Sequence, residues 1–257
     1  MQIGEAVRLS RIVKRGKILL LAYDQGMEHG PSDFNEKNTN PEYVLDIAKK
    51  GRYTGVVLQK GVAKHYFENY AGDVPLVLKL NGRTNLVPKD DIYSSPVASV
   101  KDAVNFGADA IGYTIYIGSP QEARMFSDFA QIEKEARDFG IPTILWAYPR
   151  GKHVQNEKSP EVISYAARTA LELGANIVKV NYTGSVESFR HVVQAAQKTL
   201  VISAGGSKQT DAEFIEKARE VMKAGAAGFA VGRNVWQNEE PMKITEELRK
   251  AVFGKVE

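Results

Sequence analysis

The chain has 257 residues, of which 43% are hydrophobic and 25% charged, and its formal net charge is +3. These values are ordinary for a globular protein with a sizeable core, and so small a charge gives no reason to expect a nucleic acid or a membrane surface as partner. The chain contains no cysteine, which excludes disulfides, thiolate nucleophiles and cysteine-ligated metal sites. No apolar run has the length of a signal peptide core or a membrane span, so we expect a cytoplasmic protein.

Eight strand-like apolar runs follow one another along the chain, and each ends in polar residues. They cover residues 17–24, 54–61, 75–82, 108–118, 142–151, 175–184, 200–208 and 227–234. Helical patterns separate many of them, most clearly at 41–50, 119–139, 160–173, 210–223 and 239–252. Strands that alternate with helices indicate parallel βα units, and eight units in this length predict a (β/α)8 TIM barrel. We expect a single domain over residues 1–257. The rival, a doubly wound open sheet, is disfavoured because no G-x-G-x-x-G follows the first strand.

Small-residue turns punctuate the pattern. The segments FGADA, LGANI and AGAAG each follow a helical stretch and contain a glycine that can form a left-handed helix cap. Residues 81–99 fit neither a strand nor a helix, and they predict an excursion over one end of the barrel.

The sixth run, ANIVKVNYTG, places a lysine among branched apolar residues. Lysines are almost never fully buried unless they are paired or functional. Burial would lower the pKa of Lys179, and the neutral amine could then form a Schiff base with a carbonyl. The alternative is a lysine at a strand end that reaches water or forms an ion pair. Both readings stay open on this stretch alone.

The last two runs end in glycine-rich segments, AGGSK and VGRN. In (β/α)8 barrels the loops after strands seven and eight often bind phosphate through backbone N–H groups. Glycine lets the backbone approach an anion, and arginine adds a bidentate donor. The predicted phosphate ligands are Ser203, Gly205, Gly206, Gly232 and Arg233. The alternative is that these glycines only form tight turns.

A buried lysine, a phosphate site and an acid after the first strand together indicate Schiff-base chemistry on a sugar phosphate. The amine would attack the substrate ketone, and the imine would then accept the electrons of the breaking C3–C4 bond. A general base must remove the proton of the C4 hydroxyl, and Tyr148 and Asp24 are the candidates by position. Tyr148 would need a lowered pKa, which the neighbouring cationic lysine or imine could supply. Alternatively, Tyr148 is a packed aromatic residue and Asp24 an ion-pair partner that orients Lys179.

Two further residues complete the predicted site. Trp146 is expected to form a wall of the pocket, and His29 either binds a phosphate or caps its loop. Since His29 has no second ligand nearby in the pattern, we expect neither a metal site nor a cofactor.

Several motifs resemble those of one known family. LAYDQGMEHGP, VLKLNGRT, GYTIYIGS, WAYPRG, VKVNYTG, AGGSK and VGRNVWQ look like the archaeal-type class I fructose-bisphosphate aldolases, in order from about residue 17 to 240. The resemblance implies a TIM barrel and metal-independent Schiff-base cleavage of fructose 1,6-bisphosphate, a reaction of glycolysis and gluconeogenesis. It also implies a homo-oligomer, often a ring-built decamer. It assigns the Schiff base to Lys179, proton transfer to Tyr148, a supporting role to Asp24 and a pocket wall to Trp146.

Three alternatives remain open beside this assignment. The 2-amino-3,7-dideoxy-D-threo-hept-6-ulosonate synthases share most of these motifs, although Trp146 favours the fructose-bisphosphate enzymes. A sugar-phosphate isomerase or epimerase would use Asp24 or His29 as its base and form no covalent adduct. A catalytically silent sensor of a phosphorylated metabolite is disfavoured by the pairing of Lys179 with Tyr148. Aromatic residues at 64–70 and around Trp236 are candidates for contact with a second subunit.

Overall fold

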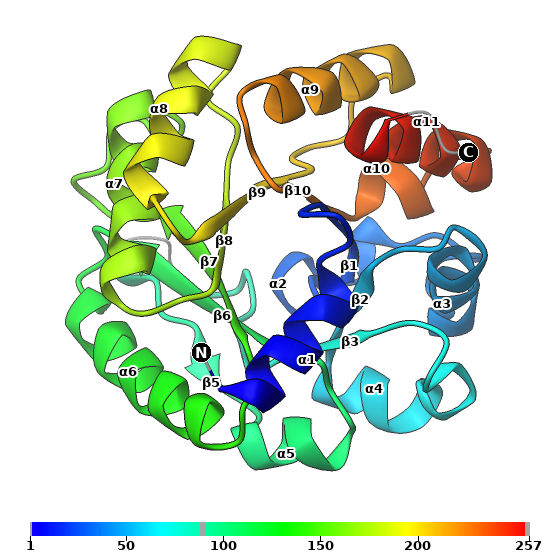
Figure 1. Ribbon diagram of the computed structural model, residues 1–257, viewed down its shortest axis with the longest axis horizontal. Helices are drawn as coiled ribbons and strands as arrows, with labels where there is room; N and C mark the ends of the chain where they lie inside the picture. The colour runs from blue at the N-terminus through cyan, green and yellow to red at the C-terminus, as the bar shows by residue number, and fades with distance from the viewer. Residues whose placement is uncertain (1, 88–90, 255–257) are drawn as a thin grey trace.

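The computed structural model describes residues 2–87 and 91–254, and its centre is a closed barrel of parallel strands (Figure 1). Around the barrel the strand order is β1-β10-β9-β8-β7-β6-β3-β2. The strands are β1 (Ile18–Tyr23), β2 (Gly55–Gln59), β3 (Leu76–Lys79), β6 (Ala110–Ile117), β7 (Thr143–Pro149), β8 (Ile177–Val180), β9 (Leu200–Ala204) and β10 (Gly228–Val231). Each lies within one of the eight predicted runs, so the prediction of a (β/α)8 barrel is confirmed.

Helices cover the outside of the barrel (Figure 1). The five predicted ones are present as α3 (Pro41–Lys50), α6 (Glu122–Asp138), α7 (Pro160–Glu172), α9 (Asp211–Lys223) and α11 (Pro241–Phe253). The helices not singled out from the sequence are α1 (Ile3–Ile12), α2 (Gly26–His29), α4 (Lys60–Tyr66), α5 (Val100–Asn105), α8 (Val186–Ala196) and α10 (Arg233–Trp236), with the 3-10 turns η1 (Pro31–Asp33) and η2 (Glu68–Tyr70). Most of these span too few turns for a clear helical period. Within the described ranges, none of the helices has the length and apolarity needed to cross a bilayer.

The first and last strands close the barrel. Residues Ile18 to Leu21 of β1 pair in parallel with Gly228 to Val231 of β10. A Cβ atom on Gly228 would lie 1.8 Å from the carbonyl oxygen of Ile18, so this closure requires a glycine. The Trp236 indole N–H donates to the carbonyl of Ala22 at 3.1 Å. Trp236 is therefore a core residue packed on Tyr23 and Phe34, and the expectation that it contacts a second subunit is wrong.

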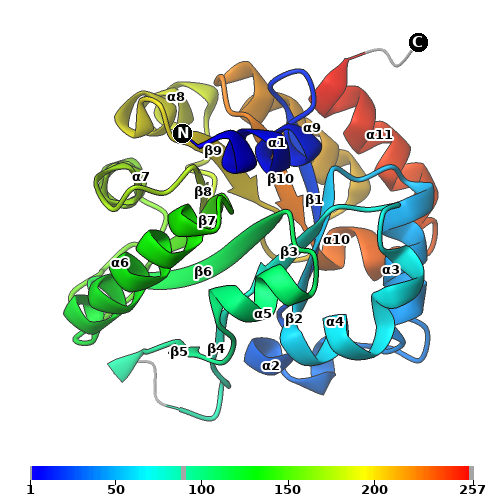
Figure 2. The same ribbon diagram turned by 60° about the horizontal axis from the view of Figure 1, so that its bottom comes forward.

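The buried apolar side chains form two clusters. The larger lies between the strands and the outer helices. The smaller fills the barrel interior and includes Leu20, Ile144, Ile177 and Ile202. Because side chains alternate along a strand, the inner set continues in steps of two toward the C-terminal end of each strand. Helix α1 covers the opposite end, where Ile12 packs into the inner core (Figure 2).

The predicted turns have the expected geometry. Gly107, Gly174 and Gly225 adopt φ values of 65°, 85° and 96°, which is the left-handed helix cap. The excursion after β3 contains a small antiparallel pair, β4 (Asn81–Gly82) with β5 (Ser95–Pro96). Residues 88–90 of this predicted excursion lie outside the described residues.

Candidate active site

A polar cavity of about 300 Å³ opens at the C-terminal end of the barrel. It is lined by all the predicted site residues except Ser203, namely Asp24, His29, Trp146, Tyr148, Lys179, Gly205, Gly206, Gly232 and Arg233. These residues come from β1, β7, β8, β9 and β10 or from the turns that follow them. The convergence follows from parallel strands, whose C-terminal ends all meet at one mouth.

Lys179 occupies the inner face of β8, two positions after the core residue Ile177. Its residue surface is 7% exposed. Burial lowers the pKa of the Lys179 ammonium to about 8, and the nearby Lys79 adds to this effect while Asp24 and Glu28 oppose it. At pH 7 about a tenth of such a lysine is the neutral amine, against less than one in a thousand for an unperturbed lysine. The environment of Lys179 thus favours the neutral amine, the form that can act as a nucleophile.

Trp146 lies between two buried lysines. It is the register partner of Lys179 across β7 and β8, and the ammonium nitrogen of Lys179 lies 5.1 Å from the centre of its indole. The ammonium nitrogen of Lys79 lies 5.6 Å from the same ring. Within the described part of the chain, the buried Trp146 Nε1 has no hydrogen-bond partner. The indole therefore sets the spacing of the lysines and leaves a donor for a bound molecule.

Gly112 makes room for this indole. A Cβ atom at position 112 would lie 2.5 Å from two ring carbons of Trp146 and 3.2 Å from Cδ of Lys79. No side chain other than hydrogen fits there unless the tryptophan moves. Gly112 therefore determines where Trp146 sits between the lysines.

Lys79 is the second buried lysine of the site, at the end of β3 and 4% exposed. Its ammonium donates to the backbone carbonyl of Asn81 at 2.9 Å and to the Asn81 side-chain oxygen at 3.0 Å. Burial lowers its pKa, while Asp24 and Glu28 raise it. These hydrogen bonds hold Lys79 in place beside Trp146, so its charge acts on Lys179 from a fixed position.

Tyr148 faces the same cavity, two residues beyond Trp146 on β7. Burial, and then the Asp24 carboxylate, raise the pKa of the Tyr148 phenol well above its ordinary value, although Arg150 opposes the shift. The expected lowering of this pKa is therefore wrong for the free protein, because burial and carboxylates outweigh the nearby cations. Tyr148 is a neutral phenol before substrate binds, and it can donate a proton rather than accept one.

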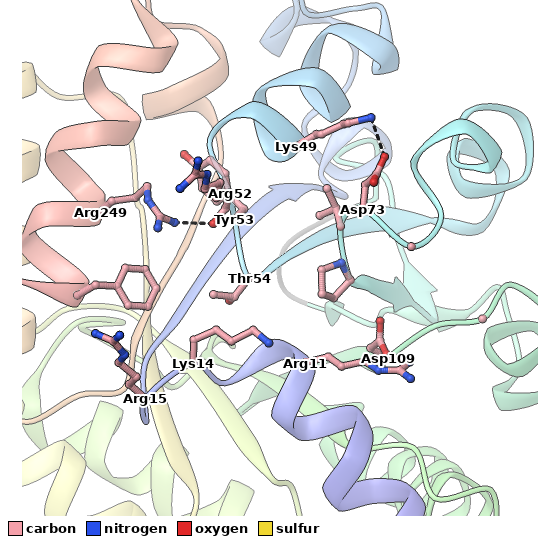
Figure 3. Close-up of a pocket in the computed structure, with 15 residues that line it drawn as sticks. Arg11, Lys14, Arg15, Lys49, Arg52, Tyr53, Thr54, Asp73, Asp109 and Arg249 are labelled. Carbon is pink, nitrogen blue, oxygen red and sulfur yellow. Dashed lines mark hydrogen bonds and ion pairs between the residues drawn. The ribbon is translucent and has the colours of Figure 1, made fainter. Parts of the chain in front are cut away.

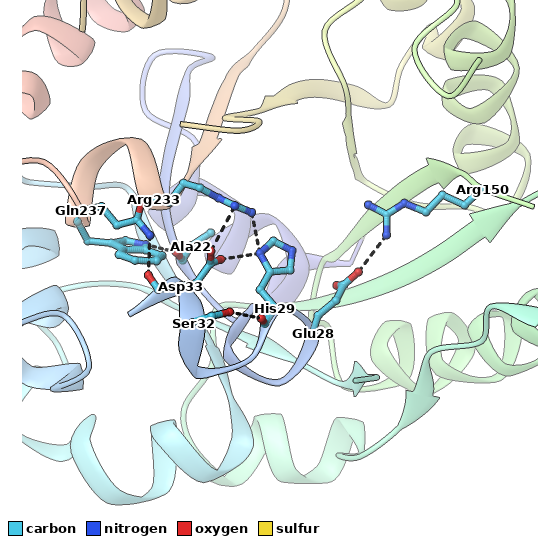
Figure 4. Close-up of polar contacts among 9 residues, drawn as sticks. Ala22, Glu28, His29, Ser32, Asp33, Arg150, Arg233 and Gln237 are labelled. Carbon is cyan, nitrogen blue, oxygen red and sulfur yellow. Dashed lines mark hydrogen bonds and ion pairs between the residues drawn. The ribbon is translucent and has the colours of Figure 1, made fainter. Parts of the chain in front are cut away.

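Glu28 and Arg150 form a polar bridge across the mouth (Figure 4). Glu28 accepts from Arg150 at 3.0 Å. It also accepts from the Tyr116 hydroxyl at 3.0 Å. Burial raises the pKa of Glu28, but Arg150, Lys79 and Tyr116 together lower it overall. The Arg150 guanidinium also lies 5.4 Å from the Tyr148 ring. Arg150 thus links the carboxylate at the mouth to the aromatic wall.

Arg233, His29 and Asp33 meet at the other side of the mouth (Figure 4). The His29 Nδ1 atom lies 2.6 Å from a carboxylate oxygen of Asp33 and 2.6 Å from Nη2 of Arg233. Arg233 also pairs with Asp33 at 3.4 Å. One ring nitrogen cannot donate to the carboxylate and accept from the guanidinium at once, so His29 can switch between the two partners. Arg233 lines the same cavity as Gly205 and Gly206, where the sequence predicts a phosphate.

The glycine-rich turns after β9 and β10 are tied together. Asn234 donates to the carbonyl of Ser207 at 3.0 Å and accepts from the N–H of Gln209 at 3.0 Å. Gly206 adopts a φ of 81°. Lys217 donates to the carbonyl of Gly205, and its pKa is lowered to about 8 by burial and then by Lys158. These hydrogen bonds tie the two turns together at the mouth of the cavity.

Ser203 does not line this cavity. Its side chain is fully buried, and its hydroxyl donates to the carbonyl of Ala204 at 3.2 Å. Strand alternation puts Ile202 and Ala204 on the inner face, so Ser203 points toward the outer helices. The prediction that Ser203 binds phosphate is therefore not supported by its position, whereas Ser207 does line the cavity.

Lys79, Gly112 and Lys217 shape the site but are not among the predicted site residues. The sequence does indicate Lys79, because it is a second lysine within an apolar strand-like run. Gly112 and Lys217 act through contacts with residues far away in the chain, so no local pattern identifies them.

Comparisons with known proteins agree with this geometry. The profile described as "DeoC/LacD family aldolase" matches residues 18–238. A class 1 fructose-bisphosphate aldolase of Thermoproteus tenax is 46% identical over 244 residues, covering 94% of this chain and 91% of the relative. One of Halobacterium salinarum is 44% identical over 247 residues, covering 95% and 93%.

Solved structures give the same result. An archaeal fructose 1,6-bisphosphate aldolase superposes with a TM-score of 0.93 at 45% identity, covering 98% of this chain and 100% of the other. Another archaeal enzyme, with its catalytic lysine covalently bound to the carbinolamine intermediate of its substrate, has a TM-score of 0.93 at 44% identity, covering 97% and 100%.

Proposed function

The chain belongs to the DeoC/LacD aldolase family, and we propose that it is a class I fructose-bisphosphate aldolase with Lys179 as its Schiff-base lysine. The observation that carries the proposal is the position of Lys179. It is a buried lysine with a pKa lowered to about 8, on the inner face of the barrel and in the polar cavity. A family of aldolases and a nucleophilic amine at the mouth together indicate covalent chemistry.

The reaction begins with attack of the Lys179 amine on C2 of fructose 1,6-bisphosphate. The resulting carbinolamine loses water and becomes a protonated imine. Tyr148 is the proposed proton donor for the departing hydroxyl, because it is a neutral phenol in the free protein. Trp146 is proposed to hold the reacting carbon beside Lys179 and to donate its unpartnered N–H to a substrate oxygen.

Cleavage follows when a base removes the proton of the C4 hydroxyl. The C3–C4 electron pair moves into the imine and leaves an enamine, and glyceraldehyde 3-phosphate departs. Asp24 is the proposed base, because it lines the cavity with Lys179 and Tyr148. Protonation of the enamine at C3 and hydrolysis of the imine then release dihydroxyacetone phosphate and restore the Lys179 amine.

The two phosphate groups of the substrate require two separate cationic regions. We place one at Gly205, Gly206, Gly232 and Arg233, where backbone N–H groups and a guanidinium converge. The other lies toward Arg150 and Arg83, which line a neighbouring cavity of about 490 Å³. On binding, phosphate would compete with Asp33 for Arg233 and with Glu28 for Arg150.

Borohydride trapping tests this proposal directly. The protein is incubated with dihydroxyacetone phosphate and sodium borohydride, which reduces an imine to a stable secondary amine, and is then analysed by peptide mass spectrometry. We expect one adduct per chain, on the peptide that contains Lys179, and none in Lys179→Ala. An adduct on Lys79 instead would move the Schiff base to β3. A protein that turns over without any adduct would support the isomerase or epimerase alternative.

A cleavage assay settles the substrate. Purified protein with fructose 1,6-bisphosphate should yield glyceraldehyde 3-phosphate and dihydroxyacetone phosphate in equal amounts. A trapped adduct without this cleavage would favour the heptulosonate synthase alternative, since it uses the same lysine with another acceptor.

We also propose that the chain is one domain over residues 1–257, acts in the cytoplasm, and assembles as a homo-oligomer, up to a decamer. Exposed apolar side chains such as Ile3, Tyr66 and Tyr165 support a subunit contact. Light scattering after size exclusion would give the number of subunits, and a monomer at micromolar concentration would contradict the proposal.

A further inference from the structure

A second cavity lies at the opposite, N-terminal end of the barrel (Figure 3). We call it the basal cavity, and its volume is about 1240 Å³. Its wall comes from the end of α1 and the chain after it, the turns that precede β2, β3 and β6, and the end of α11. Its charged lining residues are Arg11, Lys14, Arg15, Lys49, Arg52, Asp73, Asp109 and Arg249.

The charges of the basal cavity do not balance. Asp109 pairs with Arg11 at 3.0 Å, and Asp73 pairs with Lys49 at 2.6 Å. Among the described residues, Lys14 and Arg249 donate only to backbone carbonyls, those of Ser10 and of Gly51 and Arg52. Across the residues that the structure describes, Arg15 and Arg52 make no ion pair. Four cations therefore face the cavity without a described counter-charge.

The backbone at two of these cations is unusual. Arg15 has a φ of 52° and Arg52 a φ of 49°. In the described ranges only one further non-glycine residue, Gln197, has a positive φ. The left-handed conformation disfavours a long side chain, and glycine or asparagine adopts it more easily. Arginine stands at both turns despite this cost, and strained backbone of this kind concentrates at functional positions.

We propose that the basal cavity binds a small polyanion that carries two or more phosphate groups. Guanidinium groups match phosphate oxygens in a bidentate geometry, which favours phosphate over a point-like anion. A cleft lined by one sign of charge also concentrates the field and the counter-ion. The volume exceeds that of the polar cavity at the other end and accommodates a molecule of nucleotide size.

The site is separate from the catalytic cavity. The inner apolar core, with Ile12 of α1 at its N-terminal end, lies between the basal cavity and the catalytic cavity. A ligand in the basal cavity therefore cannot compete directly with the substrate, and its binding can be measured apart from cleavage.

Calorimetric titration of the full chain with inorganic triphosphate tests the proposal. The test variant is Arg15→Asn/Arg52→Asn, because asparagine removes the charge and still tolerates the left-handed backbone. The control is Arg168→Gln/Arg219→Gln, which removes two exposed charges on α7 and α9 away from both cavities. A third protein, Arg233→Gln, weakens the phosphate contacts of the catalytic cavity.

We expect binding of triphosphate to weaken at least about tenfold in Arg15→Asn/Arg52→Asn and by less than about twofold in the control. A binding event should persist in Arg233→Gln, and it should weaken as salt rises. Equal binding by the test variant and the parent, or loss of all binding in Arg233→Gln, would overturn the proposal. A parent protein that binds no triphosphate would also overturn the proposal. If the test variant then changed its oligomeric mass, the basal cavity would instead receive a second copy of the chain.

Discussion

The two ends of this barrel carry similar side chains and use them differently. At the C-terminal end, Lys79 and Lys179 lie inside the wall, and burial lowers the pKa of both. At the N-terminal end, Lys49 is about half exposed, and its pKa is raised by Asp73. Exclusion of water lowers the pKa of a lysine and favours its neutral amine, whereas a solvent-exposed lysine beside a carboxylate stays charged.

The contrast follows from the direction of the strands. At the C-terminal ends of the strands, side chains that face the barrel interior lie beyond the apolar core and line the cavity. Lys179, Trp146 and Tyr148 are such residues, and they follow core residues in steps of two along their strands. The N-terminal end is covered by α1 and by short turns, and its charged side chains line the solvent-accessible basal cavity. The buried lysines therefore lie at the first end, and the exposed cations without a described counter-charge lie at the second.

Removal of the buried Lys179 amine should have the largest effect on cleavage. Lys179→Ala should reduce cleavage below a few per cent of the parent, because the proposed imine would have no amine on which to form. The fold should persist by circular dichroism. Lys49→Ala, an exposed lysine at the opposite end, is the matched control and should keep full activity. If Lys179→Ala retains more than a few per cent, the Schiff-base assignment is wrong.

Removal of the phenol should have the next largest effect. Tyr148→Phe should slow cleavage by about 10² to 10⁴, the range for a lost general acid or base. Borohydride trapping of dihydroxyacetone phosphate on Lys179 should still occur, although more slowly. An unchanged kcat would transfer the proton role to Asp24 or to water.

A smaller change moves the indole without altering any charge. Gly112→Ala would place a methyl group 2.5 Å from the Trp146 ring, so the ring must shift from between the lysines. We expect kcat to fall by about tenfold and unfolding free energy to fall by about 1–3 kcal/mol, as for an overpacked core. Gly61→Ala is the control, because a Cβ there has no atom within 4 Å. Equal effects of the two substitutions on kcat would show that the indole position does not matter.

Replacement of Lys79 should have the smallest effect, a shift in the pH dependence of kcat/KM. Lys79 helps to lower the pKa of Lys179 to about 8, so Lys79→Met should raise it. The neutral fraction of Lys179 then falls at pH 7, and the rising limb of kcat/KM moves to higher pH. Since one pKa unit is a tenfold change, we expect a loss of about three- to tenfold at pH 7 and little loss near pH 10. A uniform loss at every pH would mean that Lys79 contacts the substrate instead.

Much of this architecture is readable from the sequence. The eight apolar runs predict the barrel, and Lys179 stands out because a lysine rarely interrupts a buried strand. Two glycine-rich turns after the seventh and eighth strands predict the phosphate region, and the structure places both turns at one cavity. These features are local, and each depends on a few neighbouring residues.

The remaining features depend on distant contacts. The pKa of Tyr148 rises because of burial and Asp24, which is more than a hundred positions away in the chain, and sequence proximity gives no sign of this. The prediction that Ser203 binds phosphate conflicts with strand alternation, because its neighbour Ile202 faces the barrel interior and Ser203 therefore faces outward. The basal cavity is assembled from five segments, so its charge excess is visible only in the fold.

Closure of the barrel by β1 and β10 has a consequence for how the protein is made. The Trp236 indole and the Ala22 carbonyl that it binds are 214 residues apart in the chain. During synthesis β1 leaves the ribosome among the first elements and β10 among the last, so one edge of β1 stays unpaired for most of translation. Contacts of such long range slow folding and leave an open strand edge that other chains can join. The nascent chain is therefore most exposed to aggregation just before its last strand arrives.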